Sequence, residues 1–224
     1  MNLLAIDTST RTCSVAASRG SELFSKSEPA AQRQAETVLG MVEELLAEAR
    51  LALAQIEGIA YGEGPGSFTG LRIAAGVTQG LALARGIGVV GVGSLLALAQ
   101  EADAGKVIAC IDAHMGEVYH AAYARASGGW EEISAPGLYR PESVPVPPGR
   151  DWIACGDGFA AHAERLAARL GERVAAVRSE ATPSALAVLK LAIPRFAAGE
   201  AKEAASAVPV YLRDKVAKKT SERA

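Results

Sequence analysis

The residues of this sequence that could do chemistry include two aspartates, each at the end of an apolar run. Asp7 follows the run 3–6, and Asp112 follows the run 107–111. Two carboxylates that face each other across a cleft can hold a metal–nucleotide complex or act as a general base. An aspartate that ends a strand is also a common turn residue, so both interpretations of this pair stay open.

A glycine-rich loop, GEGPGSFTG at residues 62–70, lies between a predicted strand and a predicted helix. Backbone N–H groups and a helix N-terminus in this arrangement can hold an anion. No Lys-Ser or Lys-Thr pair follows the glycines, so the loop is not a Walker A loop, and its spacing also differs from that of dinucleotide-binding loops. On the residues alone we prefer a tight strand-to-helix turn in which Ser67 or Thr69 caps the helix.

Metal and nucleophile chemistry find little support in the sequence. The three histidines, His114, His120 and His162, have no pair at i, i+4 on a predicted helix, and the three widely spaced cysteines form no Cys-x-x-Cys motif. No serine lies in a G-x-S-x-G elbow. An odd, scattered set of cysteines fits reduced thiols in the core. We therefore expect no metal, no cofactor and no catalytic residue in this chain.

The composition argues against several function classes. Half of the 224 residues are hydrophobic and the formal net charge is −2. Phosphate binding needs clustered Lys and Arg, so we expect no basic nucleic-acid face on the body of the protein, and we expect the basic tail from Arg213 onward to be solvated. The longest uncharged runs, 73–84 and 86–100, are shorter than the roughly 18 residues of a membrane span. The N-terminus lacks a secretory signal, so a cytoplasmic protein without membrane contact is predicted.

Hydrophobic periodicity predicts the elements that must position these residues. Helices are predicted over 33–50 and 71–85, and strands over 56–61 and 89–92. In the second helix Gly76, Gly80 and Ala84 recur every four residues and form one stripe nearly free of side chains. Each glycine costs about 1 kcal/mol of helix propensity relative to Ala. The stripe therefore indicates close approach of another helix, from this chain or from another subunit.

An internal repeat organises the chain. LLAIDTSTRTCSVAA (3–17) and IACIDAHMGEVYHAA (108–122) align without a gap and place Asp7 against Asp112. Both read as strand, aspartate, turn and second strand, which predicts two copies of one supersecondary unit, with chance similarity of two hairpins as the alternative. The polar stretch 101–106 is the predicted boundary. Beyond it, a strand is expected at 152–155, helices over 158–170 and 182–198, and an extended segment at 208–212.

Five segments, in order along nearly the whole chain, resemble the TsaB family, also called YeaZ: AIDTST (5–10), GPGSFTGLRI (64–73), QGLALARG (79–86), IDAHMGEVY (111–119) and PVYLR (209–213). GPGSFTGLRI is a highly specific motif. The resemblance implies the actin-like ATPase (ASKHA) fold, an α/β fold of two duplicated ribonuclease-H-like halves. The N-terminal half, with partner-binding helices, is then expected at 1–104, the C-terminal half at 105–205, and at 206–224 a basic segment that packs back on the first half.

The function that this resemblance implies is that of a non-catalytic scaffold in the bacterial machinery that makes N6-threonylcarbamoyladenosine at position 37 of ANN-decoding tRNAs. In that family TsaD transfers the threonylcarbamoyl group, TsaB pairs with and activates it, and the ATPase TsaE joins the pair. The tRNA is reached through the complex, and isolated members self-associate, so a homodimer is expected. The alternatives are an ASKHA-type phosphotransferase or a metallopeptidase acting alone, and a direct tRNA binder through the basic tail.

The resemblance also implies a site, because the helix after GPGSFTG belongs to the surface by which family members pair. The expected interface residues are Gly64, Pro65, Gly66, Ser67, Phe68, Thr69, Gly70, Arg72, Gly76, Gly80 and Ala84. Asp7 and Asp112 would mark at most a vestigial nucleotide cleft. The chain departs from the family at three positions: Gln34 stands where a histidine is common, Ala74 where a glycine is usual, and His114 where the family has an arginine.

Overall fold

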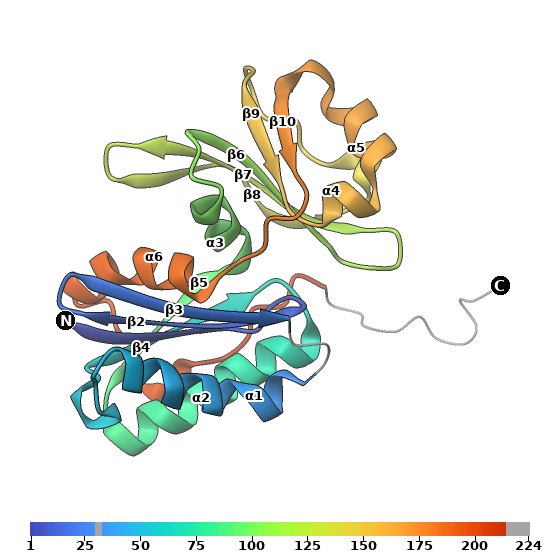
Figure 1. Cartoon of the computed structure of the whole chain (residues 1–224). Coiled ribbons are helices and arrows are strands. Elements are labelled where there is room, and N and C mark those ends of the chain that lie inside the picture. The colour runs from blue at the N-terminus through green and yellow to red at the C-terminus, as the bar shows by residue number, and fades with distance from the viewer. Residues whose placement is uncertain (30–32, 214–224) are drawn as a thin grey trace.

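The computed structural model describes residues 1–29 and 33–213, which form two mixed β-sheets with helices packed on them (Figure 1). The first sheet has the strand order β3-β2-β1-β4-β5. Its β1 and β2 are antiparallel, as are β2 and β3, while β4 and β5 run parallel to β1. The strands are β1 Asn2–Asp7, β2 Thr12–Arg19, β3 Glu22–Pro29, β4 Gly58–Gly64 and β5 Gly88–Gly93.

The second sheet repeats this topology. Read from its antiparallel edge, its order is β8-β7-β6-β9-β10, in which β6 pairs antiparallel with β7 and parallel with β9. The strands are β6 Lys106–Asp112, β7 Val118–Ala126, β8 Gly129–Tyr139, β9 Trp152–Cys155 and β10 Val174–Arg178. The predicted α/β fold of two duplicated halves is therefore confirmed. The strands β8 and β10 were not predicted from the sequence.

The two repeats differ in register by one residue. Asp7 pairs with Ser14 across the first hairpin, whereas Asp112 pairs with Val118 across the second, so the second turn is one residue shorter. A one-residue shift moves every side chain of a strand to the opposite side of its sheet. The ungapped alignment of the two segments is consequently right for β1 and β6 and wrong by one residue for β2 and β7.

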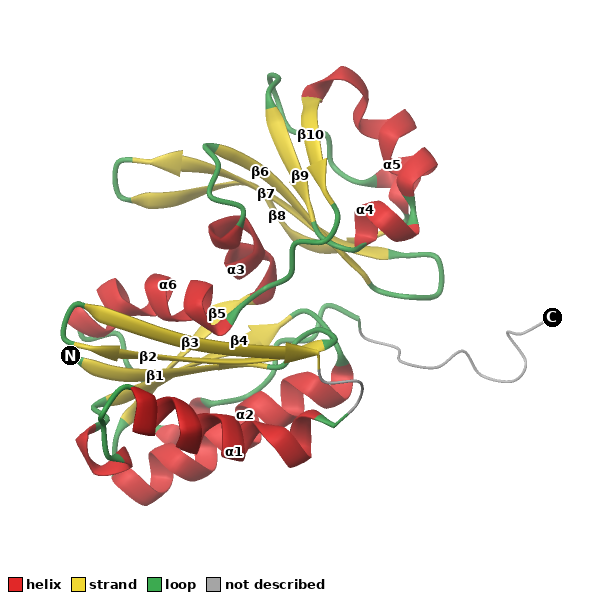
Figure 2. Ribbon diagram, viewed as in Figure 1, coloured by secondary structure: helices red, strands yellow, loops and turns green. Residues whose placement is uncertain are grey.

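The helices cover both sides of the first sheet (Figure 2). The long helices α1 and α2 lie on one side and α6 lies on the other. The helix α2 begins three residues before the predicted start because the Ser67 side chain caps it, accepting a 3.3 Å hydrogen bond from the Gly70 amide. The helices are α1 Gln34–Glu48, α2 Phe68–Arg85, α3 Ser94–Glu101, α4 Gly158–Ala161, α5 Ala163–Leu170 and α6 Ala185–Ala197, with single 3-10 turns η1 Leu53–Gln55, η2 Pro141–Ser143, η3 Gly171–Arg173 and η4 Ala204–Ser206.

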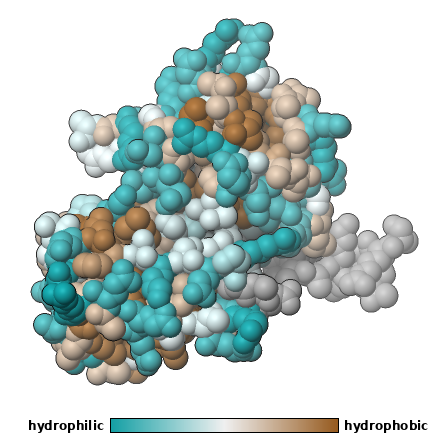
Figure 3. All heavy atoms as spheres, viewed as in Figure 1, coloured by the Kyte–Doolittle hydropathy of each residue, from teal (hydrophilic) through white to brown (hydrophobic). Residues whose placement is uncertain are grey.

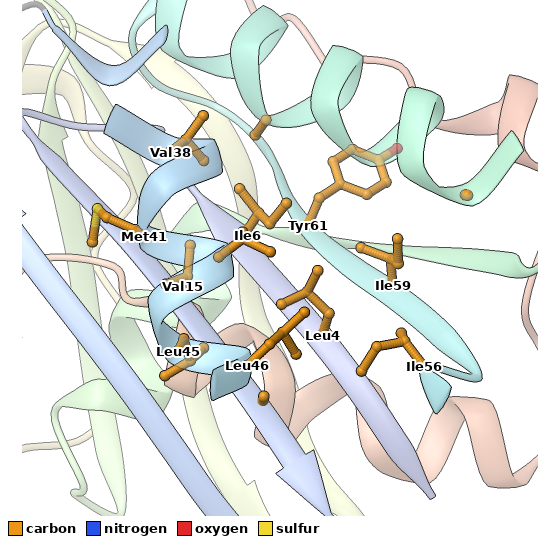
Figure 4. Close-up of a cluster of buried hydrophobic side chains, with 14 of the residues drawn as sticks. Leu4, Ile6, Val15, Val38, Met41, Leu45, Leu46, Ile56, Ile59 and Tyr61 are labelled. Atoms are coloured by element: carbon orange, nitrogen blue, oxygen red, sulfur yellow. The ribbon is translucent and has the colours of Figure 1, made fainter. Parts of the chain in front are cut away.

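The largest core lies between α1, α2 and the first sheet (Figure 4). Along α1 the buried side chains of Val38, Met41 and Leu45 recur at helical spacing and meet Leu4 and Ile6 of β1. This packing fixes both helices against the sheet. As a result, the side of α2 that faces away from the sheet is available to other molecules.

The helix α6 departs from the expected division of the chain. It lies within 105–205, the range expected for the second half, but its Val188 and Leu189 pack on Leu3 and Ala5 of the first sheet. The Ala185 amide also donates a 2.9 Å hydrogen bond to Ser14 Oγ of β2. The physical reason is that the apolar side chains on this side of the first sheet would be exposed to water without an apolar helix packed on them. The predicted basic tail beyond Arg213 lies outside the described residues.

Candidate functional site

The glycine-rich loop is clamped against the turn that follows β1. Thr8 Oγ1 donates a 2.6 Å hydrogen bond to the Gly70 carbonyl, and the Ser67 amide donates one of 2.7 Å to the Ser9 carbonyl. A Cβ atom on Gly70 would lie 1.9 Å from the Thr8 carbonyl oxygen, and one on Gly66 would lie 2.3 Å from the Ser9 carbonyl oxygen. Glycine is required at both positions because two backbones touch there.

Three amides of the loop and the first turn of α2 form hydrogen bonds inside the protein. Ser67 donates to Ser9, Gly70 donates to the Ser67 side chain, and Leu71 donates to the Ser67 carbonyl. These N–H groups are satisfied inside the protein. The geometry therefore shows the tight strand-to-helix turn, with Ser67 as the cap of α2.

Asp7 is fully buried at the end of β1. Its Oδ1 accepts hydrogen bonds from the Ser9 amide (3.1 Å) and the Ser9 hydroxyl (2.9 Å), while its Oδ2 has no partner among the described residues. Burial raises the pKa of this carboxyl from 3.8 to about 6, against the lowering effect of the two Ser9 hydrogen bonds. Gly62 leaves the room that Oδ2 occupies, because a Cβ there would lie 1.9 Å from it.

Asp112 is held in a separate network at the end of β6. Its Oδ2 lies 3.0 Å from His114 Nδ1, and its Oδ1 lies 3.3 Å from His162 Nε2. The Asp112 amide donates a 2.9 Å hydrogen bond to Asp157. No hydrogen bond joins Asp112 to Asp7 in the described part of the chain. The hydrogen bonds that each carboxylate does form are thus to neighbours within its own half.

The outward side of α2 carries glycines and exposed apolar side chains. Six exposed residues lie along it at helical spacing, and we call this set the docking face: Phe68, Arg72, Gly76, Gly80, Leu83 and Ala84. A Cβ atom on Gly76 or Gly80 would meet no heavy atom within 4 Å. Helix propensity disfavours both glycines, and packing within the described chain requires neither. Figure 3 shows apolar spheres along the lower edge of the molecule, where Figure 1 places α1 and α2.

The predicted interface residues divide into two groups. Gly64, Pro65 and Gly70 are buried and Gly66 is half-buried, so these four shape the loop rather than offer contact surface. The other seven are exposed: Ser67, Phe68, Thr69, Arg72, Gly76, Gly80 and Ala84.

Sequence reasoning missed two parts of this surface. Leu83 is 74% exposed, and its spacing of seven residues from Gly76 is a signal that could have included it. Tyr211 packs beside α2, with its ring centroid 5.6 Å from that of Phe68. Arg72 Nε donates a 2.9 Å hydrogen bond to the Tyr211 hydroxyl, across 139 positions of sequence. No local pattern could have predicted that contact.

Metal and membrane features are absent from the described residues. No group of three or more His, Cys, Asp or Glu side chains in 1–29 and 33–213 is arranged to hold a metal ion. Within the same residues, no helix has both the length and the apolar character needed to cross a bilayer.

Comparison with known proteins identifies the family. A family model described as TsaD, tRNA N6-adenosine threonylcarbamoyltransferase, matches residues 26–221. A protein of Escherichia coli named tRNA threonylcarbamoyladenosine biosynthesis protein TsaB is 36% identical over 228 residues, which covers 97% of this chain and 96% of that protein. The chain belongs to the TsaB family. The Haemophilus influenzae TsaB is 34% identical, with 96% of this chain and 95% of that protein covered.

Solved structures of TsaB-family proteins agree with the fold. A structure of YeaZ from Pseudomonas aeruginosa is 41% identical, covers 94% of this chain and 99% of its own, and superposes with a TM-score of 0.88. A second, described as an uncharacterized protein with similarity to peptidase YEAZ from the same organism, gives a TM-score of 0.89 at 41% identity, with 95% and 99% covered. The resemblance to the TsaB family and the fold it implied are therefore confirmed.

The three departures from the TsaB-family pattern lie in different surroundings. Ala74 is a residue of α2 and is buried in the core between this helix and the first sheet. Gln34 is the first residue of α1, and its side-chain nitrogen Nε2 lies 3.3 Å from the Thr10 carbonyl oxygen. His114 lies in the β6–β7 turn (residues 113–117) with a positive φ of 59°. None of the three belongs to the docking face.

Proposed function

We propose that this chain is a non-catalytic scaffold subunit of the bacterial machinery that makes N6-threonylcarbamoyladenosine in tRNA, and that it pairs with and activates a TsaD-type transferase. The names of its relatives support the pathway. The observation that carries the scaffold role is the docking face, where two glycines in one helix have empty space above them. A second helix that approaches this stripe closely would bury it, and this gives both glycines a function.

The surroundings of the two aspartates support a non-catalytic role. A catalytic carboxylate must reach its substrate within hydrogen-bond distance, and Asp7 is fully buried with Oδ1 bonded to Ser9. Asp112 is engaged by two histidines within its own half. Neither observation favours the alternative of a phosphotransferase or metallopeptidase that acts alone.

The complex that we propose has further members. A TsaE-type ATPase joins the pair, and tRNA is reached through the assembled complex in the cytoplasm. The isolated chain forms a homodimer through the docking face, which then competes with the transferase. Residues 1–104 supply this face, 105–205 form the second half except for α6, and 206–224 form the C-terminal segment.

The test is an association measurement with two substitutions at one position. Gly80→Leu places a large side chain in the stripe and should weaken binding to a purified TsaD-type transferase at least about 100-fold by steric exclusion. Gly80→Ala adds one methyl group to open space and is the matched control for the fold of the helix. If Gly80→Leu binds the transferase as the wild-type chain does, the docking face is not the interface.

A further inference from the structure

A second element runs beside the docking face. Residues 205–211, which we call the strap, begin within η4 and lie along α2. The Ala205 carbonyl lies 3.5 Å from Gln79 Nε2, and the Tyr211 hydroxyl accepts a hydrogen bond from Arg72, about two turns earlier in α2. The strap therefore borders α2 over two turns, in the opposite chain direction.

Hydrogen bonds to residues of β4 hold the backbone of the strap in place. The Val208 amide donates a 3.0 Å hydrogen bond to the Tyr61 hydroxyl, which in turn lies 3.1 Å from the Val208 carbonyl. The Val210 amide donates a 2.7 Å hydrogen bond to the Glu63 carbonyl. Because these bonds order the strap in the free protein, a partner that binds it loses little affinity to ordering.

The strap nevertheless exposes its apolar side chains. Ten large hydrophobic side chains are exposed in the described part of the chain, and five of them lie on the docking face or the strap: Phe68, Leu83, Val208, Val210 and Tyr211. Exposed apolar residues gathered around one helix mark an interaction surface, whereas scattered ones need no explanation.

Arg72 gives this surface its charge. Its guanidinium carbon lies 3.6 Å from the centroid of the Phe68 ring, and its Nε is bonded to Tyr211. Its two terminal nitrogens have no acceptor among the described residues, and α2 contains two arginines and no acidic residue. The guanidinium is thus held over the Phe68 ring and beside the Tyr211 hydroxyl. An arginine fixed in this way can bind a carboxylate with two parallel hydrogen bonds.

We propose that the docking face extends onto the strap, and that it fits a helix of the transferase that presents a carboxylate to Arg72 and apolar side chains to Val208, Val210 and Tyr211. This inference rests on the proposed function and specifies the chemistry of the partner. The glycine stripe admits the helix, the strap contacts its flank, and Arg72 fixes its register.

The test measures the affinity of full-length variants for a purified TsaD-type transferase at several salt concentrations. Tyr211→Ala and Val208→Asp are each expected to weaken binding at least about tenfold. Val208→Asp changes an exposed side chain and leaves every backbone hydrogen bond of the strap in place. Leu23→Ala, on β3, removes a similarly exposed apolar side chain outside this surface and should change nothing.

Arg72 is tested through the salt dependence of the same binding. In Arg72→Gln the affinity for the transferase should depend less on salt concentration than in the wild type. In Arg72→Lys the salt dependence should match the wild type, but the affinity should stay lower because lysine cannot form the bidentate pair. Binding by Val208→Asp and Tyr211→Ala within twofold of wild type would overturn the strap proposal. If Gly80→Leu abolishes binding in that same series, the proposed scaffold function still holds. If all variants bind as the wild type does, both the scaffold function and the strap proposal are contradicted.

Discussion

The Thr8 hydroxyl donates a 2.6 Å hydrogen bond to the Gly70 carbonyl, and a Cβ atom added to Gly70 would lie 1.9 Å from the Thr8 carbonyl oxygen. The first turn of α2 is thus pressed directly onto the turn that follows β1. This contact sets the position of the helix that carries the docking face. The same helix contains Gly80, above which there is open space.

These two glycines of α2 should respond in opposite directions to alanine. Gly70→Ala forces two backbones apart and should lower the free energy of unfolding by about 2–3 kcal/mol. Gly80→Ala improves helix propensity without a clash and should raise it by about 0.5–1 kcal/mol. Urea unfolding followed by circular dichroism measures both. A change of the same sign in the two variants would contradict the packing described for α2.

Asp7 should make the protein less stable as pH rises. Its pKa is about 6 in the native state and 3.8 in the unfolded chain, so between these values the unfolded chain releases its proton first. The stability contributed by the protonated carboxyl is complete below pH 4 and lost as pH rises through 6, a total of about 3 kcal/mol. The stability of Asp7→Asn minus that of wild type should therefore increase by about 2–2.5 kcal/mol from pH 4 to pH 7. A flat difference would mean that Asp7 is solvated.

His120 should have the opposite pH dependence. Its ring is buried on β7 in an edge contact with Tyr139, and neither ring nitrogen has a partner in the described residues. Burial lowers its pKa from 6.5 to about 4, so the unfolded chain takes up a proton first as pH falls. Stability is complete above pH 6.5 and declines toward pH 4 by about 3 kcal/mol.

The matched substitution is His120→Leu, which removes the titrating group. Its stability relative to wild type should grow as pH falls from 7 to 4, while that of Asp7→Asn shrinks over the same range. Because the two groups act in opposite directions, the wild type should show less pH dependence than either variant. Parallel curves for the two variants would contradict the assignment of both groups.

Arg213 should hold the β6–β7 turn closed. It forms a 2.8 Å ion pair with Glu117 and donates a 3.0 Å hydrogen bond to the Ala113 carbonyl. Arg213→Ala should increase hydrogen exchange of the Glu117 amide about tenfold or more, because the turn loses both contacts. Arg150→Ala, which removes the exposed pair with Glu172, is the control and should leave that amide unchanged. Equal exchange in both variants would show that the turn is stable without Arg213.

The local parts of this structure could be predicted from sequence, because periodicity and capping act over a few residues. The spacing of Val38, Met41 and Leu45 predicted α1, and the repeat around Asp7 and Asp112 predicted two related sheets. The register of the second hairpin could not be predicted, because it depends on a turn in which His114 and Met115 both adopt positive φ.

The nonlocal parts of the candidate site lay beyond sequence reasoning. Nothing near Tyr211 indicates that it meets Arg72, since that contact depends on the path of the chain after α6. The motif around Gly70 marked the loop as special, but only the structure separates its buried glycines from the exposed ones of α2. A motif thus located the surface without distinguishing the buried residues that shape the loop from the exposed residues of α2.

The scaffold role itself is tested by the formation of N6-threonylcarbamoyladenosine in a mixture of purified TsaD-type transferase, TsaE-type ATPase, threonylcarbamoyl-adenylate and tRNA, with this chain added, omitted or replaced by Gly80→Leu. We expect modification with the wild-type chain, little without it, little with Gly80→Leu, and no ATP turnover by the chain alone. Equal rates of modification with and without the chain would contradict the scaffold role.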